Sequence, residues 1–289
     1  MKDKNMPHSV ATRLLNLARK RGESYEYMLI RYGVERLLYR LSQSNAADRF
    51  LLKGASLFLV WNGFHYRPTR DVDLLGYGNP DPSRLTEFFC ALCKEDRMHE
   101  DGLVFLSDSV CSERIKEGQE YEGVRICLRA LLQNARIDLQ VDIGFGDLVI
   151  PEPTMADFPV LLDAPVPKIR VYSKETVFAE KLQTIVARGL ANSRLKDYLD
   201  LWVLSMSDID KESLTQAIRS TFRHRSTDVP RELPPGLSLA FAQNPDRVKQ
   251  WRGLLQRVNM ENHDTALEHV IADLAHYVIP LFASIQTDH

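Results

Sequence analysis

The stretch Arg70-Asp71-Val72-Asp73-Leu74 decides the fold and the candidate chemistry of this 289-residue chain. Side chains alternate across a β-strand, so a strand over 71–75 puts Asp71 and Asp73 on one face and the apolar residues toward a core. Two neighbouring carboxylates repel each other unless a cation lies between them, and Mg²⁺ prefers carboxylate oxygens together with substrate phosphates. The pattern therefore predicts a site for Mg²⁺ or Mn²⁺. The alternative is a solvated edge strand with two surface aspartates.

The residues upstream, Leu52-Lys53-Gly54-Ala55-Ser56-Leu57, predict a strand that enters a turn of small residues and then a helix. The first amides of such a helix are exposed and its N-terminal end carries partial positive charge, so it can hold a phosphate. Ser56 adds a hydroxyl to this candidate phosphate site. A plain strand-to-helix turn is the alternative from these residues alone.

Apolar periodicity predicts an α+β domain around a small mixed sheet in the first half of the chain. Residues 10–41 have helical spacing that is interrupted near Gly22 and Gly33, which indicates two or more helices. From residue 49 to residue 150 short β-like runs alternate with helical ones. Strands are expected at 50–52, 71–75, 124–129 and 137–143, and helices at 55–61 and 85–92.

The prolines between residues 151 and 168 predict a surface connector, because proline does not fit inside a helix. Beyond this segment the spacing is helical, and a Ser173-x-x-Thr176 pattern indicates where the first helix begins. Helices are expected at 173–187, 195–204, 211–222, 246–258 and 265–278. The expected division is 1–48 for N-terminal helices, 49–165 for the α+β domain and 166–289 for an all-helical domain.

The composition is that of an ordinary globular protein, with 44% hydrophobic and 26% charged residues and a formal net charge of −2. The charge balance excludes a histone-like or polybasic protein, so any contact with nucleic acid must come from a local basic patch. We find no secretory leader and no apolar run near the roughly 18 residues that span a bilayer, and we expect a cytoplasmic protein with no membrane partner. Cys90 and Cys93 are expected to pack along a helix rather than to bind metal.

Several separate motifs occur in a fixed order along the chain. Lys53-Gly54-Ala55-Ser56 is followed by Arg67-Pro68-Thr69-Arg70-Asp71-Val72-Asp73-Leu74, and then by 175–182 and 188–201. This order resembles the AbiEii/AbiGii-type toxins, which are members of the DNA polymerase β-like nucleotidyltransferase superfamily. The resemblance covers about residues 50–204. Ala55 stands where the family usually has a glycine, which leaves Ser56 in register but makes the turn less permissive.

The resemblance implies a palm-like nucleotidyltransferase domain at 49–165 and a third carboxylate on the strand near 136–143. Asp138, Gln140 and Asp142 share a face of that strand, and Asp142 fits the family pattern best. The implied metal ligands are Asp71, Asp73 and Asp142. The implied catalytic residues are Asp71, Asp73, Lys181 and Asp197, and the implied nucleotide-binding residues are Gly54, Ala55, Ser56, Arg70, Lys181 and Arg188. Supporting roles are expected for Lys53, Arg67, Thr69, Arg194, Lys196 and Asp200.

Without the resemblance, Lys181 reads as a solvated residue on a helix of mixed charge. Asp197 and Asp200 are three residues apart on an expected helix, so they meet on one face near Arg194 and Lys196. A structural ion-pair network is the alternative to a catalytic role for these residues.

The function expected from these patterns is a metal-dependent nucleotidyltransferase with Mg²⁺ or Mn²⁺ as cofactor and a nucleoside triphosphate as substrate. The resemblance implies the toxin of a type IV toxin–antitoxin pair, with an antitoxin encoded nearby and an RNA acceptor such as the tRNA 3′ end. Two alternatives stay open: a nucleotidyltransferase acting on a small molecule, and a catalytically silent module that binds nucleotide or RNA.

Overall fold

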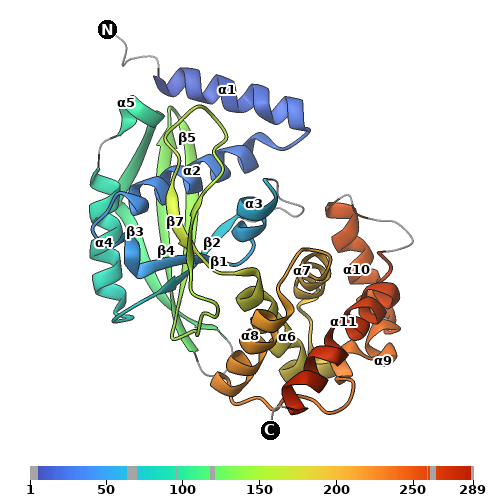
Figure 1. Cartoon of the computed structure of the whole chain (residues 1–289). Helices are drawn as coiled ribbons and strands as arrows, with labels where there is room; N and C mark the ends of the chain where they lie inside the picture. Colours follow the sequence, from blue (N-terminus) through green and yellow to red (C-terminus); the bar gives the residue numbers. More distant parts are fainter. Residues whose placement is uncertain are drawn as a thin grey trace. The chain divides into compact units, whose positions relative to one another are not determined.

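The computed structural model describes residues 6–63, 70–95, 97–117, 121–258, 260 and 265–287. Contacts divide the chain into two compact units, which Figure 1 shows with the elements coloured along the sequence. Unit 1 comprises Met1–Asp147 and Thr154–Val171, and unit 2 comprises Leu148–Pro153 and Tyr172–His289. The division expected from the sequence placed 166–171 with the second part, whereas here these residues belong to unit 1.

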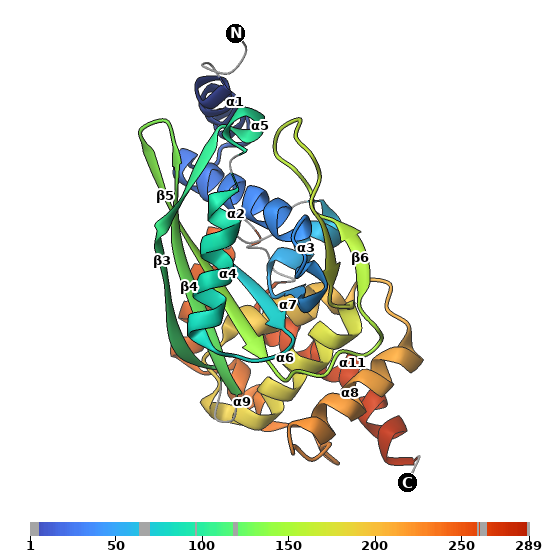
Figure 2. The same cartoon turned by 90° about the vertical axis from the view of Figure 1, so that its left-hand side faces the viewer.

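Within the described residues, unit 1 is built around one seven-stranded mixed sheet with the order β3-β4-β5-β2-β1-β7-β6. Its long strands β3, β4 and β5 lie side by side (Figure 2). The strands are β1 (Phe50–Lys53), β2 (Asp71–Gly76), β3 (Leu103–Glu117), β4 (Tyr121–Leu132), β5 (Ala135–Phe145), β6 (Thr154–Asp157) and β7 (Lys168–Val171). The helices are α1 (Met6–Arg21), α2 (Tyr25–Ser42), α3 (Ser56–Asn62), α4 (Pro82–Lys94) and α5 (Met98–Asp101). The α+β fold with a mixed sheet is confirmed.

Strand β2 has the alternation that the sequence predicts, since Val72 and Leu74 are buried while Asp71 and Asp73 are partly exposed. Strand β1 pairs antiparallel with β2, and β5 pairs parallel with it, so β2 lies in the interior of the sheet. The edge-strand alternative is therefore wrong. Because β2 is hydrogen-bonded to a strand on each side, the backbone that carries the two aspartates is held in place.

Helices α2 and α4 cover the apolar face of the sheet. Gly33 of α2 lies against Leu139 and Ile137 of β5, and a Cβ at this position would lie 3.1 Å from Leu139. The rings of Phe88 on α4 and Phe50 on β1 stack at 5.4 Å between centroids. The predicted helix break at Gly33 is wrong, because this glycine allows close packing of an unbroken helix on the sheet.

Three strands of unit 1 were not expected from the sequence, namely β3, β6 and β7. The proline-rich segment contains β6 and ends where β7 begins, and β7 pairs with both β6 and β1. Between them, Phe158 and Leu161 are buried. The segment is therefore part of the sheet and its core, and its prediction as a surface connector is wrong.

Helix α2 holds that segment through two buried charged side chains. Glu35, which is fully buried, accepts a hydrogen bond from the Leu161 amide at 2.7 Å. Arg36 lies 2.9 Å from Glu35 and donates to the Pro165 carbonyl at 2.8 Å. Burial raises the pKa of Glu35 to about 7, against the opposing effect of Arg36.

The raised pKa of Glu35 predicts a pH dependence of stability. Between the ordinary carboxyl pKa and pH 7 the folded protein binds more protons than the unfolded chain, so the free energy of unfolding falls as the pH rises through 7. The Glu35→Gln variant keeps an acceptor for Leu161 and removes this titration. We expect the free energy of unfolding of the wild-type protein, relative to this variant, to fall by up to about 3 kcal/mol from pH 5 to pH 8 in urea titrations. A difference that does not change with pH would contradict the assignment.

Unit 2 is helical, as the sequence predicts. Its helices are α6 (Lys174–Arg188), α7 (Leu195–Ser205), α8 (Lys211–His224), α9 (Leu239–Ala242), α10 (Pro245–Arg257) and α11 (Leu267–Thr287). The Ser173 hydroxyl accepts a hydrogen bond from the Thr176 amide at 3.1 Å, which confirms the predicted start of α6. The core of unit 2 includes Phe178, Leu201 and Phe222.

Among the described residues, α11 is the one helix whose length and composition would let it cross a membrane. The sequence patterns predicted a helix at 265–278 but no membrane span, and Glu268 and Asp273 interrupt its apolar residues. Val270, Leu274 and Val278 are buried within unit 2, and α11 packs against α7 and α8. These contacts are those of a core helix, which passes the same test of length and composition.

Candidate active site

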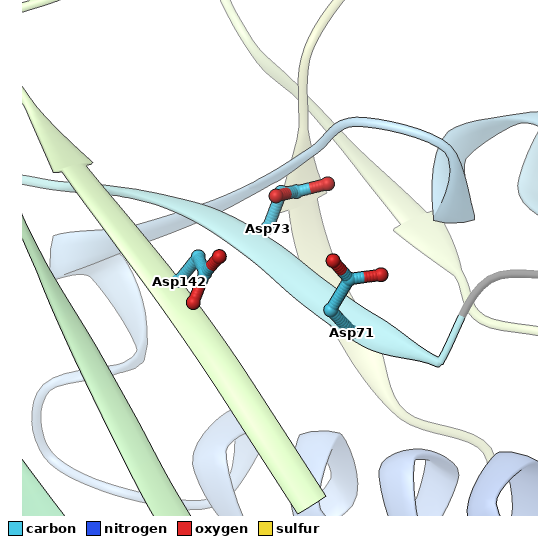
Figure 3. Close-up of side chains that lie close together, drawn as sticks. All are labelled: Asp71, Asp73 and Asp142. Carbon is cyan, nitrogen blue, oxygen red and sulfur yellow. The ribbon is translucent and has the colours of Figure 1, made fainter. Parts of the chain in front are cut away.

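Three carboxylates of unit 1 converge on the face of the sheet opposite α2 and α4. Asp71 and Asp73 project from β2, and Asp142 projects from the neighbouring strand β5 (Figure 3). One oxygen from each side chain lies within 4.8 Å of the others. The parallel register places Asp73 directly beside Asp142. An oxygen-only donor set of this size and charge fits a divalent cation such as Mg²⁺.

The turn at Gly54 lies directly against the cluster. Gly54 has φ +71°, and a Cβ built on it would lie 2.0 Å from Oδ2 of Asp73. A side chain at this position would therefore occupy the place of the carboxylate. The turn of small residues that the sequence singled out is thus adjacent to the acidic cluster, with Ser56 buried in the first turn of α3.

We expect Gly54→Ala to remove most of the activity by displacing Asp73. The left-handed backbone adds strain of roughly 1 kcal/mol, and a displacement of about 1 Å at a reacting centre lowers rates by about 10²-fold. Gly22→Ala is the matched control, because Gly22 also has positive φ, +67°, but a Cβ built on it would have nothing within 4 Å. Both variants share the backbone strain and should stay folded, with the larger loss of stability in Gly54→Ala because of its clash with Asp73, and only Gly54→Ala should lose activity. Equal activity in the two variants would contradict this account.

Asp142 has a partner that the sequence patterns did not indicate. Arg125 of β4 donates from Nε to Oδ1 at 2.8 Å and from Nη2 to Oδ2 at 2.9 Å, and these hydrogen bonds raise the pKa of its guanidinium. Gln140 donates to the same two oxygens at 3.1 and 3.2 Å. A signal that could have found Arg125 is the turn Gln133-Asn134 with alternating residues on both sides, because a two-residue turn fixes the hairpin register that pairs Arg125 with Asp142.

Other predicted residues of unit 1 have different partners. The Lys53 ammonium lies 3.1 Å from the Asp147 carboxylate, with both side chains almost fully buried. Arg70 is largely exposed and lies 3.2 Å from Glu26. Ala55 is buried in the turn. Arg67 and Thr69 lie outside the described residues, and their supporting role stays a prediction.

The second group of predicted residues forms a cluster within unit 2. The Lys181 ammonium lies 2.6 Å from Asp197 and 2.8 Å from Asp200. Arg194 donates to the other oxygen of Asp197 at 2.7 Å. Asp200 is fully buried, so its negative charge depends on a nearby cation. Arg188 and Lys196 are exposed on this unit. The catalytic roles of these residues stay predictions.

The family model described as nucleotidyl transferase AbiEii toxin, type IV toxin–antitoxin system, matches residues 36–273. The chain belongs to this AbiEii family. It is accordingly a nucleotidyltransferase, and the resemblance stated from the motifs is confirmed. Membership implies a nucleoside triphosphate substrate and a divalent metal ion, with which the acidic cluster is compatible.

Two solved structures resemble this AbiEii-family chain. JHP933 from Helicobacter pylori has 13% sequence identity and a TM-score of 0.48, over 90% of this chain and 91% of that protein. An antigenic nucleotidyltransferase-like protein from Paracoccidioides brasiliensis has 14% identity and a TM-score of 0.39, over 67% of this chain and 88% of that protein. No curated protein matched the chain.

Proposed function

We propose that this AbiEii-family nucleotidyltransferase holds Mg²⁺ at Asp71, Asp73 and Asp142 and transfers a nucleotide to an RNA acceptor. The observation that carries the proposal is the convergence of three carboxylates within 4.8 Å beside the Gly54 turn. A bound divalent ion supplies charge neutralisation and a template for the phosphates. The three carboxylates would bind it, and the turn at Gly54, Ala55 and Ser56 would contact phosphate oxygens through amides and a hydroxyl.

Lys181 serves the same reaction in this proposal, with Asp197 holding its ammonium in place. The support is the resemblance of their motifs and the short contact of 2.6 Å between them. A lysine with two carboxylate partners is fixed in position, and its ammonium is placed to offset negative charge on a phosphate. Arg188 is exposed at the end of α6 and supplies a second cation in the same proposal.

The acceptor in this proposal is the 3′ end of tRNA, and its modification blocks translation. The support is the type IV toxin–antitoxin family, together with exposed basic residues such as Lys196 and Arg194 that suit contacts with an RNA backbone. An antitoxin encoded nearby restrains the enzyme, and both act in the cytoplasm, where nucleoside triphosphates and tRNA occur together.

The test is to incubate the purified chain with Mg²⁺, total tRNA and each α-labelled nucleoside triphosphate in turn. We expect label in RNA that lies at the 3′ end and that disappears in Asp71→Ala. Label in a small molecule identified by mass spectrometry would favour the small-molecule enzyme. Tight binding of nucleotide or RNA without Mg²⁺ and without any transfer would favour the silent binding module and contradict the proposal.

A further inference from the structure

A row of charged residues crosses five neighbouring strands in register. Glu113 of β3 faces Arg125 of β4, and Arg125 faces Asp142 of β5. Asp142 faces Asp73 of β2, and Asp73 faces Lys53 of β1. Register partners place their side chains on the same face of a sheet. The two adjacent acids of the candidate metal site are therefore flanked on each side by a cation.

Arg125, the flanking cation on β4, binds an acid of the cluster through both ends of its guanidinium fork. Lys53 lies 3.1 Å from Asp147, and Arg125 makes two short hydrogen bonds to Asp142 of the acidic cluster. A guanidinium that binds both oxygens of a carboxylate fixes the plane of that group as well as its position. The Asp142 side chain is only 10% exposed, so contacts with protein groups rather than with water set its orientation.

The contacts of Asp142 with Arg125 and Gln140 use part of its capacity to accept hydrogen bonds. A carboxylate accepts about four hydrogen bonds. Arg125 occupies one edge of the group with two direct contacts, and Gln140 divides a single amide between the same two oxygens. The contacts of Gln140, at 3.1 and 3.2 Å, are longer than those of Arg125, so Arg125 is the stronger of the two partners.

We propose that Arg125 is a positioning residue, whose fork holds the Asp142 carboxylate in the orientation that completes the cation site with Asp71 and Asp73. This inference rests on the proposed function, since it assumes that the cluster binds a divalent ion. Residues that orient metal ligands typically change metal affinity by about 10- to 100-fold when they are removed. Arg125 acts through Asp142 and has no direct contact with the substrate in this proposal.

Arg129 provides a matched control on the same strand. It faces Asp138 in the same hairpin register and lies 2.7 Å from it, but the Asp138 side chain is 74% exposed. Asp138 does not belong to the cluster of three carboxylates. Removing Arg129 therefore tests the loss of an arginine–aspartate pair on β4 without disturbing the site.

The experiment titrates the nucleotide-free, full-length chain with Mn²⁺ and follows free Mn²⁺ by electron paramagnetic resonance. We expect Arg125→Ala to raise the dissociation constant by roughly 10- to 100-fold, and Arg129→Ala to leave it unchanged. Arg125→Lys keeps the charge but not the fork, so its affinity should lie between those of the wild-type protein and Arg125→Ala. Thermal unfolding of each variant shows that it is folded.

The outcomes separate this inference from the proposed function. If the wild-type chain binds Mn²⁺ and Arg125→Ala or Arg125→Lys binds it equally well, the positioning role is overturned and the metal site stands. If Arg129→Ala weakens Mn²⁺ binding as much as Arg125→Ala, the loss of affinity comes from a general disturbance of β4, and the inference is also overturned. If the wild-type chain binds no Mn²⁺, both the metal site and the positioning role are overturned.

Discussion

Asp73→Asn should lower the rate of nucleotide transfer by roughly 10²- to 10³-fold or more, because it removes one negative charge from a cation site of three carboxylates. Asparagine keeps the size of the side chain, so the Gly54 turn that packs against it should stay intact. The metal-free variant should stay folded, which thermal unfolding checks.

Asp138→Asn is the control for this prediction. Asp138 lies on β5 two positions from Gln140, is largely exposed and pairs with Arg129. Its replacement should change the transfer rate little. A fully active Asp73→Asn, measured in the same labelled-nucleotide assay, would exclude the acidic cluster as the site of the reaction.

Lys181→Met should have the largest effect within unit 2, on both stability and activity. It removes the ammonium that lies 2.6 Å from Asp197 and 2.8 Å from Asp200, two carboxylates that are almost fully buried. Breaking such a buried pair from one side costs about 3–5 kcal/mol. We expect a loss of this order in chemical unfolding, together with a loss of nucleotide transfer.

Two companion variants separate the structural role of Lys181 from its role in the reaction. Lys181→Arg keeps the positive charge and should keep most of the stability, while the larger fork alters the contact with phosphate. Asp200→Asn in the Lys181→Met background removes one uncompensated buried charge and should recover part of the stability without recovering activity. If the double variant transfers nucleotide at the wild-type rate, Lys181 has no part in the reaction.

Local patterns were sufficient to predict the elements that carry the acidic cluster. Alternation around Asp71 and Asp73 indicated β2, and the small residues at 54–56 indicated the turn into α3. These signals are short in range, since each depends on side-chain period or on backbone freedom within a few residues. Local patterns could not identify the third carboxylate, because only the family resemblance selected Asp142 among three polar residues on one face of β5.

Features that depend on contacts distant in the sequence could not be predicted in this way. From the sequence alone Gly33 predicts a helix break, whereas in the structure it allows α2 to pack closely against β5. The strands β6 and β7 follow prolines and become strands by pairing at the edge of the sheet and with β1. Arg125 has no distinguishing neighbours in the sequence, and its role depends on the hairpin register that places it opposite Asp142.

The most direct test of the central claim is anomalous diffraction at the manganese edge from crystals of the full chain soaked with Mn²⁺ and a non-hydrolysable nucleoside triphosphate analogue. The account predicts an anomalous peak in contact with carboxylate oxygens of Asp71 and Asp73, with Asp142 beside it and the analogue's phosphates on the peak. Crystals that contain the bound analogue but show no peak at these three side chains would contradict it.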